Sequence, residues 1–411
     1  MNKLIASAGR VEQARLTSIA GSSNEVSGLL QRSEEQQRAA GYFHTLREIL
    51  QQPTTWLETG ALLAPRGDEL RPLVEGLRSL VLTGSGSSEY AGDCICLPLQ
   101  NRLSVPVQTV GGGMLLTHSG AAIGPGRPGL LVSLGRSGDS PESVGVVSAI
   151  LASEPEMRHL VVTCNAEGRL ARTFCDDPRV KVILLPEQTN DCSLVMTSSF
   201  SNMVLAGAFL GMLETPGQYL GMVEELSRIE DGLLHKYIDT LASVARRGFK
   251  RAIYLASGAR LGAARESALK MVEMTAGKVW AASETYLGLR HGPMSAVHPD
   301  TLVVCFLSSD PLVRAYECDL IRELNDKQLG MGRIVFGEKI PSDLVRPDDV
   351  AVECEGLAQL GDDQVPVIDV LVGQLLAFFR CMEEGLKPDS PSDDGVISRV
   401  VQEFELHHRK S

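Results

Sequence analysis

The sequence predicts an α/β protein with two doubly wound, flavodoxin-like parallel sheets that carry helices on both faces. Short apolar runs rich in Val, Ile and Leu alternate with helical patterns along most of the 411 residues. Such continuous apolar strands are typical of parallel sheets that are buried on both faces. The alternation restarts past the middle of the chain, and at roughly 100–200 residues per domain the length allows two or three domains.

The first half contains five predicted strands, and two prominent helical patterns lie between or after them. The strands are Leu80–Thr83, Val105–Val110, Gly129–Leu134, His159–Cys164 and Val180–Leu185, and the helices are Ser140–Ser153 and Ser193–Leu213. Residues 1–45 are predicted as an N-terminal segment with a flexible start and then a helix. That helix should end near Pro53, because proline disrupts a helix interior. The first domain is predicted at 46–215.

The second half repeats this order after Thr215-Pro216-Gly217 interrupts a helical stretch. Its predicted strands are Ala252–Ala256, Val279–Ala282, Leu302–Leu307, Arg333–Phe336 and Val350–Glu353, and its predicted helices are Arg260–Ala276, Leu312–Leu329 and Pro366–Glu384. The segment from Leu80 to Gly86 matches the segment from Ile253 to Gly258, which indicates an internal repeat. The second domain is predicted at 216–411, and ligands are expected at the carboxyl ends of strands.

Composition excludes several classes of function. Lys+Arg 39 and Asp+Glu 51 give a net charge of 39 − 51 = −12, which argues against nucleic acid as a partner. No apolar stretch approaches the roughly 20 residues that span a bilayer, so no membrane partner is expected. The nine cysteines form neither a CxxC pair nor a zinc pattern, which favours a cytoplasmic location. The histidine spacing suggests no metal, and no cofactor is predicted.

Two Ser- and Gly-rich loops each follow a predicted strand and precede a predicted helix, at 84–88 and 135–142. Backbone N–H groups at such turns form anion sites together with small hydroxyls. Ser140 suits an N-cap and Pro141 suits the first helical position. Either loop alone is explained as well by a turn and a cap, but two loops at one sheet edge favour a phosphate site. Glu89 stands where a dinucleotide fingerprint needs its third Gly, and no Walker A lysine follows.

A group of charged residues lies on one predicted helix. Glu266, Lys270 and Glu273 follow each other at i, i+4 and i+7, so they share one face. A solvated stripe of charge would explain this spacing as well as an active site does. His291 precedes Gly-Pro, and its imidazole could move a proton near neutral pH, although a lone histidine is often structural.

Together these motifs resemble the tandem sugar isomerase (SIS) family, and within it the AgaS-type isomerase/deaminase branch. The resemblance covers the chain from about Thr45. It is carried by seven segments: Glu48–Pro53, Gly84–Ser88, Arg136–Ser143, Glu266–Lys270, Thr275–Lys278, Leu287–Pro293 and Lys387–Pro391. It implies two tandem SIS domains that act on a phosphorylated hexosamine or ketohexose without a metal or a cofactor.

The resemblance also implies roles for individual residues. The positions that match the phosphate cradle are Ser87, Ser88, Arg136, Ser137, Gly138, Asp139 and Ser140. The positions that match the reacting end are Glu273 as the general base between C1 and C2, Lys270 and Glu266 as its helical neighbours, and His291 as the ring-opening acid or base. In relatives this histidine reaches the site of a neighbouring subunit, so a homodimer or higher homo-oligomer is expected.

Two departures from the related glucosamine-6-phosphate synthase concern arginines. The synthase carries a lysine near its C-terminus, and this chain has Arg399 in the corresponding region. The synthase carries a glutamine where this chain has Arg136, and a direct contact between Arg136 and the phosphate is expected. Arginine does not readily form a Schiff base, so Arg399 is predicted to bind substrate. The leading hypothesis is deamination and isomerisation of galactosamine 6-phosphate to tagatose 6-phosphate and ammonium. The alternatives are a ketose/aldose-phosphate isomerase, a fructosamine-6-phosphate deglycase and a non-catalytic sugar-phosphate sensor.

Overall fold

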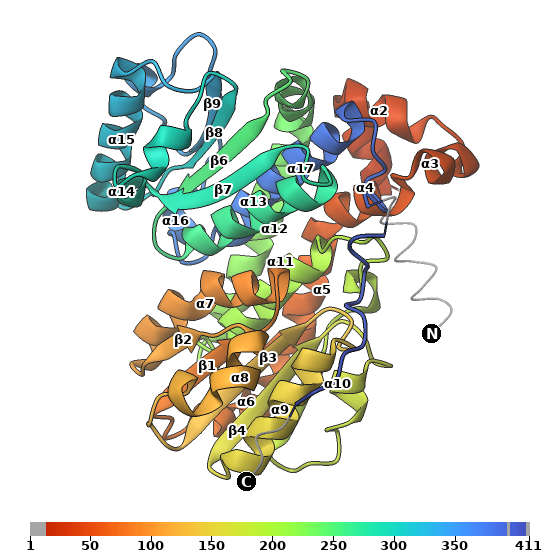
Figure 1. The fold of residues 1–411 in the computed structure, drawn as a ribbon, viewed down its shortest axis with the longest axis vertical. Helices are drawn as coiled ribbons and strands as arrows, with labels where there is room; N and C mark the ends of the chain where they lie inside the picture. Colours follow the sequence, from red (N-terminus) through yellow and green to blue (C-terminus); the bar gives the residue numbers. More distant parts are fainter. Residues whose placement is uncertain (1–13, 393–394, 408–411) are drawn as a thin grey trace. The chain divides into compact units, whose positions relative to one another are not determined.

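The computed structural model describes residues 14–392 and 395–407, which form two compact units (Figure 1). The first, called the 55–223 unit, comprises the described residues of Thr55–Val223 and Asp393–Ser411. The second, called the 224–392 unit, comprises those of Met1–Thr54 and Glu224–Ser392. Each unit therefore combines separate stretches of chain. The flexible start predicted before residue 14 lies outside the described residues.

The 55–223 unit is built on a five-stranded parallel sheet with the order β2-β1-β3-β4-β5. The strands are β1 Ser79–Thr83, β2 Val107–Thr109, β3 Gly129–Gly135, β4 Met157–Thr163 and β5 Val180–Leu184. The helices that lie within the unit are α6 Gly67–Val74, α7 Ser87–Leu103, α8 Gly112–Ala122, α9 Pro141–Ser153, α10 Arg169–Arg172 and α11 Ser198–Phe209. The chain passes between the units within α5 Gln52–Leu63 and within α12 Pro216–Ala245. All five predicted strands of this half are present.

The 224–392 unit is built on a second parallel sheet with the order β10-β9-β8-β6-β7. The strands are β6 Arg251–Ala256, β7 Trp280–Thr285, β8 Thr301–Phe306, β9 Gly332–Gly337 and β10 Val350–Glu353. The helices are α2 Asn24–Leu30, α3 Glu34–Ala40, α4 Phe43–Leu50, α13 Arg260–Met274, α14 Tyr286–Leu289, α15 Pro311–Asp326, α16 Leu357–Leu360 and α17 Pro366–Glu383. In both sheets the first strand pairs with the second and with the third.

The predicted fold class is confirmed, because the central strands are covered on both faces. Every residue of β1, β3, β8 and β9 is buried. In the 224–392 unit the core joins β6, β8 and β9 to α14 and α15 through residues such as Leu255, Val303 and Ile321. No helix among residues 14–392 and 395–407 is long and apolar enough to cross a membrane.

Several of the predicted element boundaries were wrong. The helix expected over Ser193–Leu213 is shorter, since α11 begins only at Ser198 and ends at Phe209. The strand expected over Val279–Ala282 runs over Trp280–Thr285 as β7. The helix before Pro53 ends at Leu50, as predicted, and the proline lies in the first turn of α5.

The Lys387–Pro391 motif holds the start of α4. The N-cap residue of α4, Tyr42, makes no side-chain cap hydrogen bond. The Asp389 carboxylate takes that role, because it accepts from the N–H groups of His44 and Thr45 at 3.1 and 2.7 Å. The Thr45 hydroxyl donates to the same carboxylate at 2.8 Å. This motif is therefore a structural clasp for the N-terminus of α4.

Candidate phosphate cradle and proton-transfer residues

The first Ser/Gly loop lies at the carboxyl end of β1, where α7 begins. Gly86 is the N-cap of α7 and adopts a φ of 58°, a left-handed conformation that favours glycine. Ser87 and Ser88 form the first turn of α7, and both are buried. Anions are stabilised at this end of a helix by the N–H groups and the helix dipole. The expected position of this loop between a strand and a helix is confirmed.

The second loop follows β3, the direct neighbour of β1 in the sheet. Gly138 has a φ of 67°, and a Cβ there would lie 3.1 Å from the Leu170 side chain, so the turn requires glycine. The Asp139 carboxylate accepts from the Arg169 backbone N–H at 3.0 Å. The backbone N–H of Asp139 donates to the Ser137 hydroxyl at 3.3 Å. The side chain of Asp139 is thus directed at α10. The two loops lie on adjacent parallel strands, roughly 5 Å apart.

Ser140 occupies the N-cap of α9, and Pro141 is the first helical residue, as predicted. However, Ser140 makes no side-chain cap hydrogen bond. Its hydroxyl is therefore not used in capping the helix. A serine at this point, beside the positive end of the α9 dipole, is suited to donate to a phosphate oxygen.

Arg136 does not resemble a phosphate ligand in this structure. Its side chain is buried, and Nη1 donates to the backbone carbonyls of Ser193, Leu194 and Val195 at 3.0–3.1 Å. Nη2 donates to the carbonyl of Arg399 at 2.7 Å. The predicted direct contact therefore competes with four hydrogen bonds to the backbone.

Asp191 belongs to the same region, and the sequence reasoning missed it. It is fully buried and its carboxylate accepts from the N–H groups of Thr197 and Ser199 at 2.8 and 2.9 Å. These bonds fix an irregular turn before α11, which explains why the helix starts later than predicted. Asp191 lies six residues before the N-cap Thr197, so the usual N-cap pattern does not reveal it.

The charged residues of α13 form one contact array in the 224–392 unit. Lys270 Nζ lies 3.3 Å from Glu266 Oε1 and contacts Glu273 Oε2 directly. The side chains of Lys270 and Glu266 are fully buried, whereas that of Glu273 is 24% exposed. The solvated stripe that the spacing also allowed is therefore wrong. A lysine between two carboxylates holds the more exposed one in place.

His291 follows α14 and is exposed. Its backbone is held by a hydrogen bond from its N–H to the Gly288 carbonyl at 2.9 Å, and Gly292 beside it has a φ of 124°. The preceding Arg290 is anchored to Glu323 of α15 at 2.7 Å. The imidazole is thus presented on a fixed loop. Among the described residues it has no hydrogen bond to Glu273.

In the 224–392 unit, carboxylates occupy the carboxyl ends of the strands, where the 55–223 unit has the Ser/Gly loops of the candidate cradle. After β8, the N–H of Ser308 donates to Glu317 at 2.6 Å, and the N–H of Ser309 donates to Asp362 at 2.9 Å. Arg260, at the start of α13, forms a fully buried ion pair with Asp369 at 2.6 Å. Internal acids therefore use the donors that an anion would need, so the cradle geometry is specific to the 55–223 unit.

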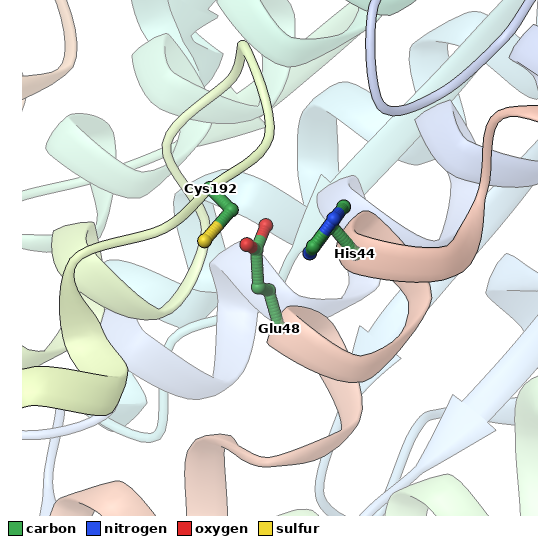
Figure 2. A group of neighbouring side chains, drawn as sticks. All are labelled: His44, Glu48 and Cys192. Carbon is green, nitrogen blue, oxygen red and sulfur yellow. The ribbon is translucent and has the colours of Figure 1, made fainter. Parts of the chain in front are cut away.

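Figure 2 shows three side chains whose type would suit a metal, His44, Glu48 and Cys192. His44 and Glu48 share a face of α4, and Arg38 Nη1 lies 2.8 Å from His44 Nε2. Arginine always donates, so the lone pair of Nε2 is already engaged. Cys192 belongs to the other compact unit, and no metal site is assigned to these residues.

Comparisons with known proteins place the chain among phosphosugar enzymes. No family model matches it. It is 36% identical over 374 residues to an AgaS protein of Streptomyces coelicolor, which covers 89% of this chain and 95% of that protein. It is 34% identical to the D-galactosamine-6-phosphate deaminase AgaS of Escherichia coli, with 88% and 95% covered. The solved structure of tagatose-6-phosphate ketose/aldose isomerase from Escherichia coli matches with a TM-score of 0.79 at 32% identity, covering 86% of this chain and 95% of that one.

Proposed function

Because the chain belongs to the AgaS branch of the tandem sugar isomerase (SIS) family, we propose that it is an amino-sugar-phosphate deaminase/isomerase. The proposed substrate is galactosamine 6-phosphate, and the products are tagatose 6-phosphate and ammonium. The observation that carries the proposal is the array on α13, in which buried Lys270 holds the partly exposed carboxylate of Glu273. A carboxylate that is fixed but accessible is the group that proton transfer at carbon requires.

The proposed reaction begins with ring opening assisted by His291. Glu273 then removes the proton from C2 of the open-chain amino sugar and returns it to C1. With one further proton moving from nitrogen to O1, this transfer turns the C1 aldehyde into an alcohol and the C2 amine into an imine. One water molecule then adds to C2, and ammonia leaves as the ketone forms. The mass balance is one amino-sugar phosphate plus one water giving one ketose phosphate plus one ammonia.

The proposed anchor for the substrate is the cradle of the 55–223 unit. Hydroxyls and amides of Ser87, Ser88, Ser137 and Ser140 would hold the phosphate without a salt bridge. The burial of Ser87, Ser88 and Ser137 and the two helix N-termini beside the four serines support this role. Phosphate binding far from the reacting carbons supplies orientation, which lowers the barrier more than binding of the reacting end alone. We assign no metal or cofactor to the reaction.

We also propose that the protein forms a homodimer or a higher homo-oligomer. His291 is exposed, and Leu287 on the adjoining α14 is 47% exposed although it is a large apolar residue. Exposed apolar side chains beside a candidate catalytic histidine suit a subunit contact. Light scattering after size exclusion should give at least twice the 44.3 kDa chain mass; a monomer would refute this part. The cytoplasmic location stays a prediction.

The function is tested by product identification. The protein is incubated separately with galactosamine 6-phosphate, glucosamine 6-phosphate and N-acetylgalactosamine 6-phosphate, and products are identified by NMR while ammonia is measured enzymatically. We expect tagatose 6-phosphate and ammonia in equal amounts from the first sugar. A ketose product that keeps its nitrogen would favour the plain isomerase. Thermal stabilisation by these sugars without any product would favour the sensor.

A further inference from the structure

Two arginines of the 55–223 unit, Arg136 and Arg399, lie 263 positions apart in the sequence and are in contact, because Arg136 donates to the Arg399 carbonyl. Both side chains also donate to the loop 190–197. Arg136, directly after β3, donates to three successive carbonyls of the 193–195 segment and to the carbonyl of Arg399. Arg399 in turn donates from Nε to the carbonyl of Asp191 at 2.8 Å and from Nη2 to the Asn190 side chain at 2.7 Å. Each guanidinium therefore joins the C-terminal tail, residues 395–407, to the loop 190–197.

The tail has two further contacts within the same unit. Glu403 forms an ion pair with Arg169 of α10 at 2.7 Å. Leu406 packs on α9, where a Cβ added to Gly145 would lie 2.9 Å from the Leu406 Cδ1. Since α9 and α10 flank the 135–140 loop, the tail runs beside the cradle. The Arg169 N–H also binds the Asp139 carboxylate, which links tail and cradle through one residue.

The loop that the tail binds also touches the cradle. Ser88 Oγ lies 3.9 Å from the sulfur of Met196, at the end of this loop. Within the same loop, the Asp191 carboxylate accepts from the N–H groups of Thr197 and Ser199 and so ties the loop to the N-terminus of α11. A change in the position of loop 190–197 would therefore be transmitted to the first turn of α7.

The charges of this region favour an anion without contacting it. Arg136, Arg399 and Asp191 are close to one another, because Arg136 donates to the Arg399 carbonyl and Arg399 donates to the Asp191 carbonyl. The guanidinium groups of Arg136 and Arg399 add positive charge to a region that also holds the carboxylates of Asp139 and Asp191. In a buried region this charge raises the affinity for a phosphate at longer range than a hydrogen bond reaches.

From these contacts we propose that Arg136 is a positioning residue rather than a phosphate ligand. It clamps the tail, through Arg399, onto the loop 190–197 and thereby fixes the cradle in its binding geometry. The clamp rests on the proposed function, because it assumes that the cradle binds the sugar phosphate. An arginine is required because its planar fork serves several carbonyls at once, whereas a lysine supplies the charge at a single point.

The experiment compares Arg136→Met and Arg136→Lys with the unaltered full chain. Hydrogen–deuterium exchange is measured on peptides from the tail and from the loop 190–197, and binding of inorganic phosphate is measured by calorimetry. We expect both variants to increase exchange in both segments about 10- to 100-fold, the range for losing charge-assisted hydrogen bonds. Both variants should weaken phosphate binding, because both lose the clamp, and Arg136→Met should weaken it more, because Arg136→Lys keeps the charge.

Two variants away from the cradle test the clamp separately. Gly145→Ala should displace Leu406 and raise exchange in the tail, while Glu403→Gln, at an exposed ion pair, should change it less than threefold, as weak surface pairs do. With amino-sugar phosphates, loss of the clamp should lower kcat/KM for Gly145→Ala as well as for both Arg136 variants.

Two results would overturn the clamp. One is unchanged exchange in Arg136→Met with phosphate affinity reduced more than tenfold, which is the behaviour of a direct ligand. The other is release of the tail in Gly145→Ala with unaltered kinetics. Failure of the unaltered protein to release ammonia from any amino-sugar phosphate would refute the proposed function instead, and the exchange measurements would still decide on the clamp.

Discussion

The ammonium group of Lys270 contacts the carboxylate of Glu273 one turn further along α13. Lys270 is fully buried and also lies 3.3 Å from the buried Glu266, whereas Glu273 reaches partial exposure. A buried cation between two acids fixes the orientation of the accessible one. The three charged residues of α13 therefore form an array in which Glu273 is positioned to act as a base.

Lys270→Met should destabilise the protein by about 3–5 kcal/mol, because it leaves the buried Glu266 carboxylate without its nearest cation. Adding Glu266→Gln should restore most of this loss, since position 266 then carries no charge. Lys278→Met, at an exposed lysine after the same helix, serves as the control. Urea unfolding curves measure the free energies; equal stability of Lys270→Met and the control would disprove the buried array.

His159 should make the 55–223 unit less stable as the pH falls. It lies in β4 with 1% exposure, and within the described part of the chain neither ring nitrogen has a hydrogen-bond partner. Burial, reinforced by Arg179, lowers the pKa of His159 to about 4, below the value near 6.5 of the unfolded chain. The folded state then binds fewer protons between pH 6.5 and 4, so stability is lost across this window.

His159→Leu should remove this pH dependence, which amounts to about 3 kcal/mol at 1.36 kcal/mol per pKa unit. The fluorescence of Trp56, in the same unit, reports unfolding in a Trp280→Phe background. His118→Gln, at an exposed histidine, is the matched control. The same change in stability between pH 7 and pH 4.5 in His159→Leu and in the control would contradict the prediction.

Glu317 should have the opposite effect on the 224–392 unit. Burial raises the pKa of Glu317 to about 7, although one oxygen accepts from the Ser308 N–H. The folded pKa lies above the unfolded value, so the stabilisation is complete below about pH 4.5 and is lost as the pH rises to 7. Glu317→Gln should therefore be more stable than the unaltered protein at pH 8. Hydrogen exchange of β8 at pH 6 and pH 8 in both proteins measures this, and a Glu317→Gln protein that is less stable than the unaltered protein at pH 8 would refute it.

Asp389→Ala should loosen α4, because the carboxylate caps that helix from a distant part of the chain. Loss of an N-cap costs about 1–2 kcal/mol. Asp389→Asn should retain part of the effect, since the amide oxygen still accepts. Ser33→Ala, which removes the capping box of the exposed helix α3, gives the comparison. Exchange in residues 43–50 should rise for Asp389→Ala and remain unaltered for Ser33→Ala.

The fold could be predicted largely from local patterns. The wholly buried strands β1, β3, β8 and β9 follow from apolar runs, because parallel strands buried on both faces have little polar content. Boundaries were predicted less well where a distant side chain decides them. Asp191 delays the start of α11, and no periodicity in residues 193–213 contains that information.

The candidate site could be predicted in part. The loops after β1 and β3 and the charged face of α13 were found from residue type and spacing. The role of Arg136 could not be found this way, since its partners are backbone carbonyls 57 to 263 positions away. The acids at the second sheet were also missed, because Arg260 and Asp369 meet only in the folded chain.

The most direct test of the account is ammonia release from galactosamine 6-phosphate by the unaltered protein and by Glu273→Gln. We expect one ammonia per tagatose 6-phosphate from the unaltered protein. For Glu273→Gln we expect turnover lower by about 10²–10⁴-fold, the usual contribution of a positioned general base, with sugar-phosphate affinity nearly unchanged. Undiminished ammonia release by Glu273→Gln, or none from the unaltered protein, would contradict the account.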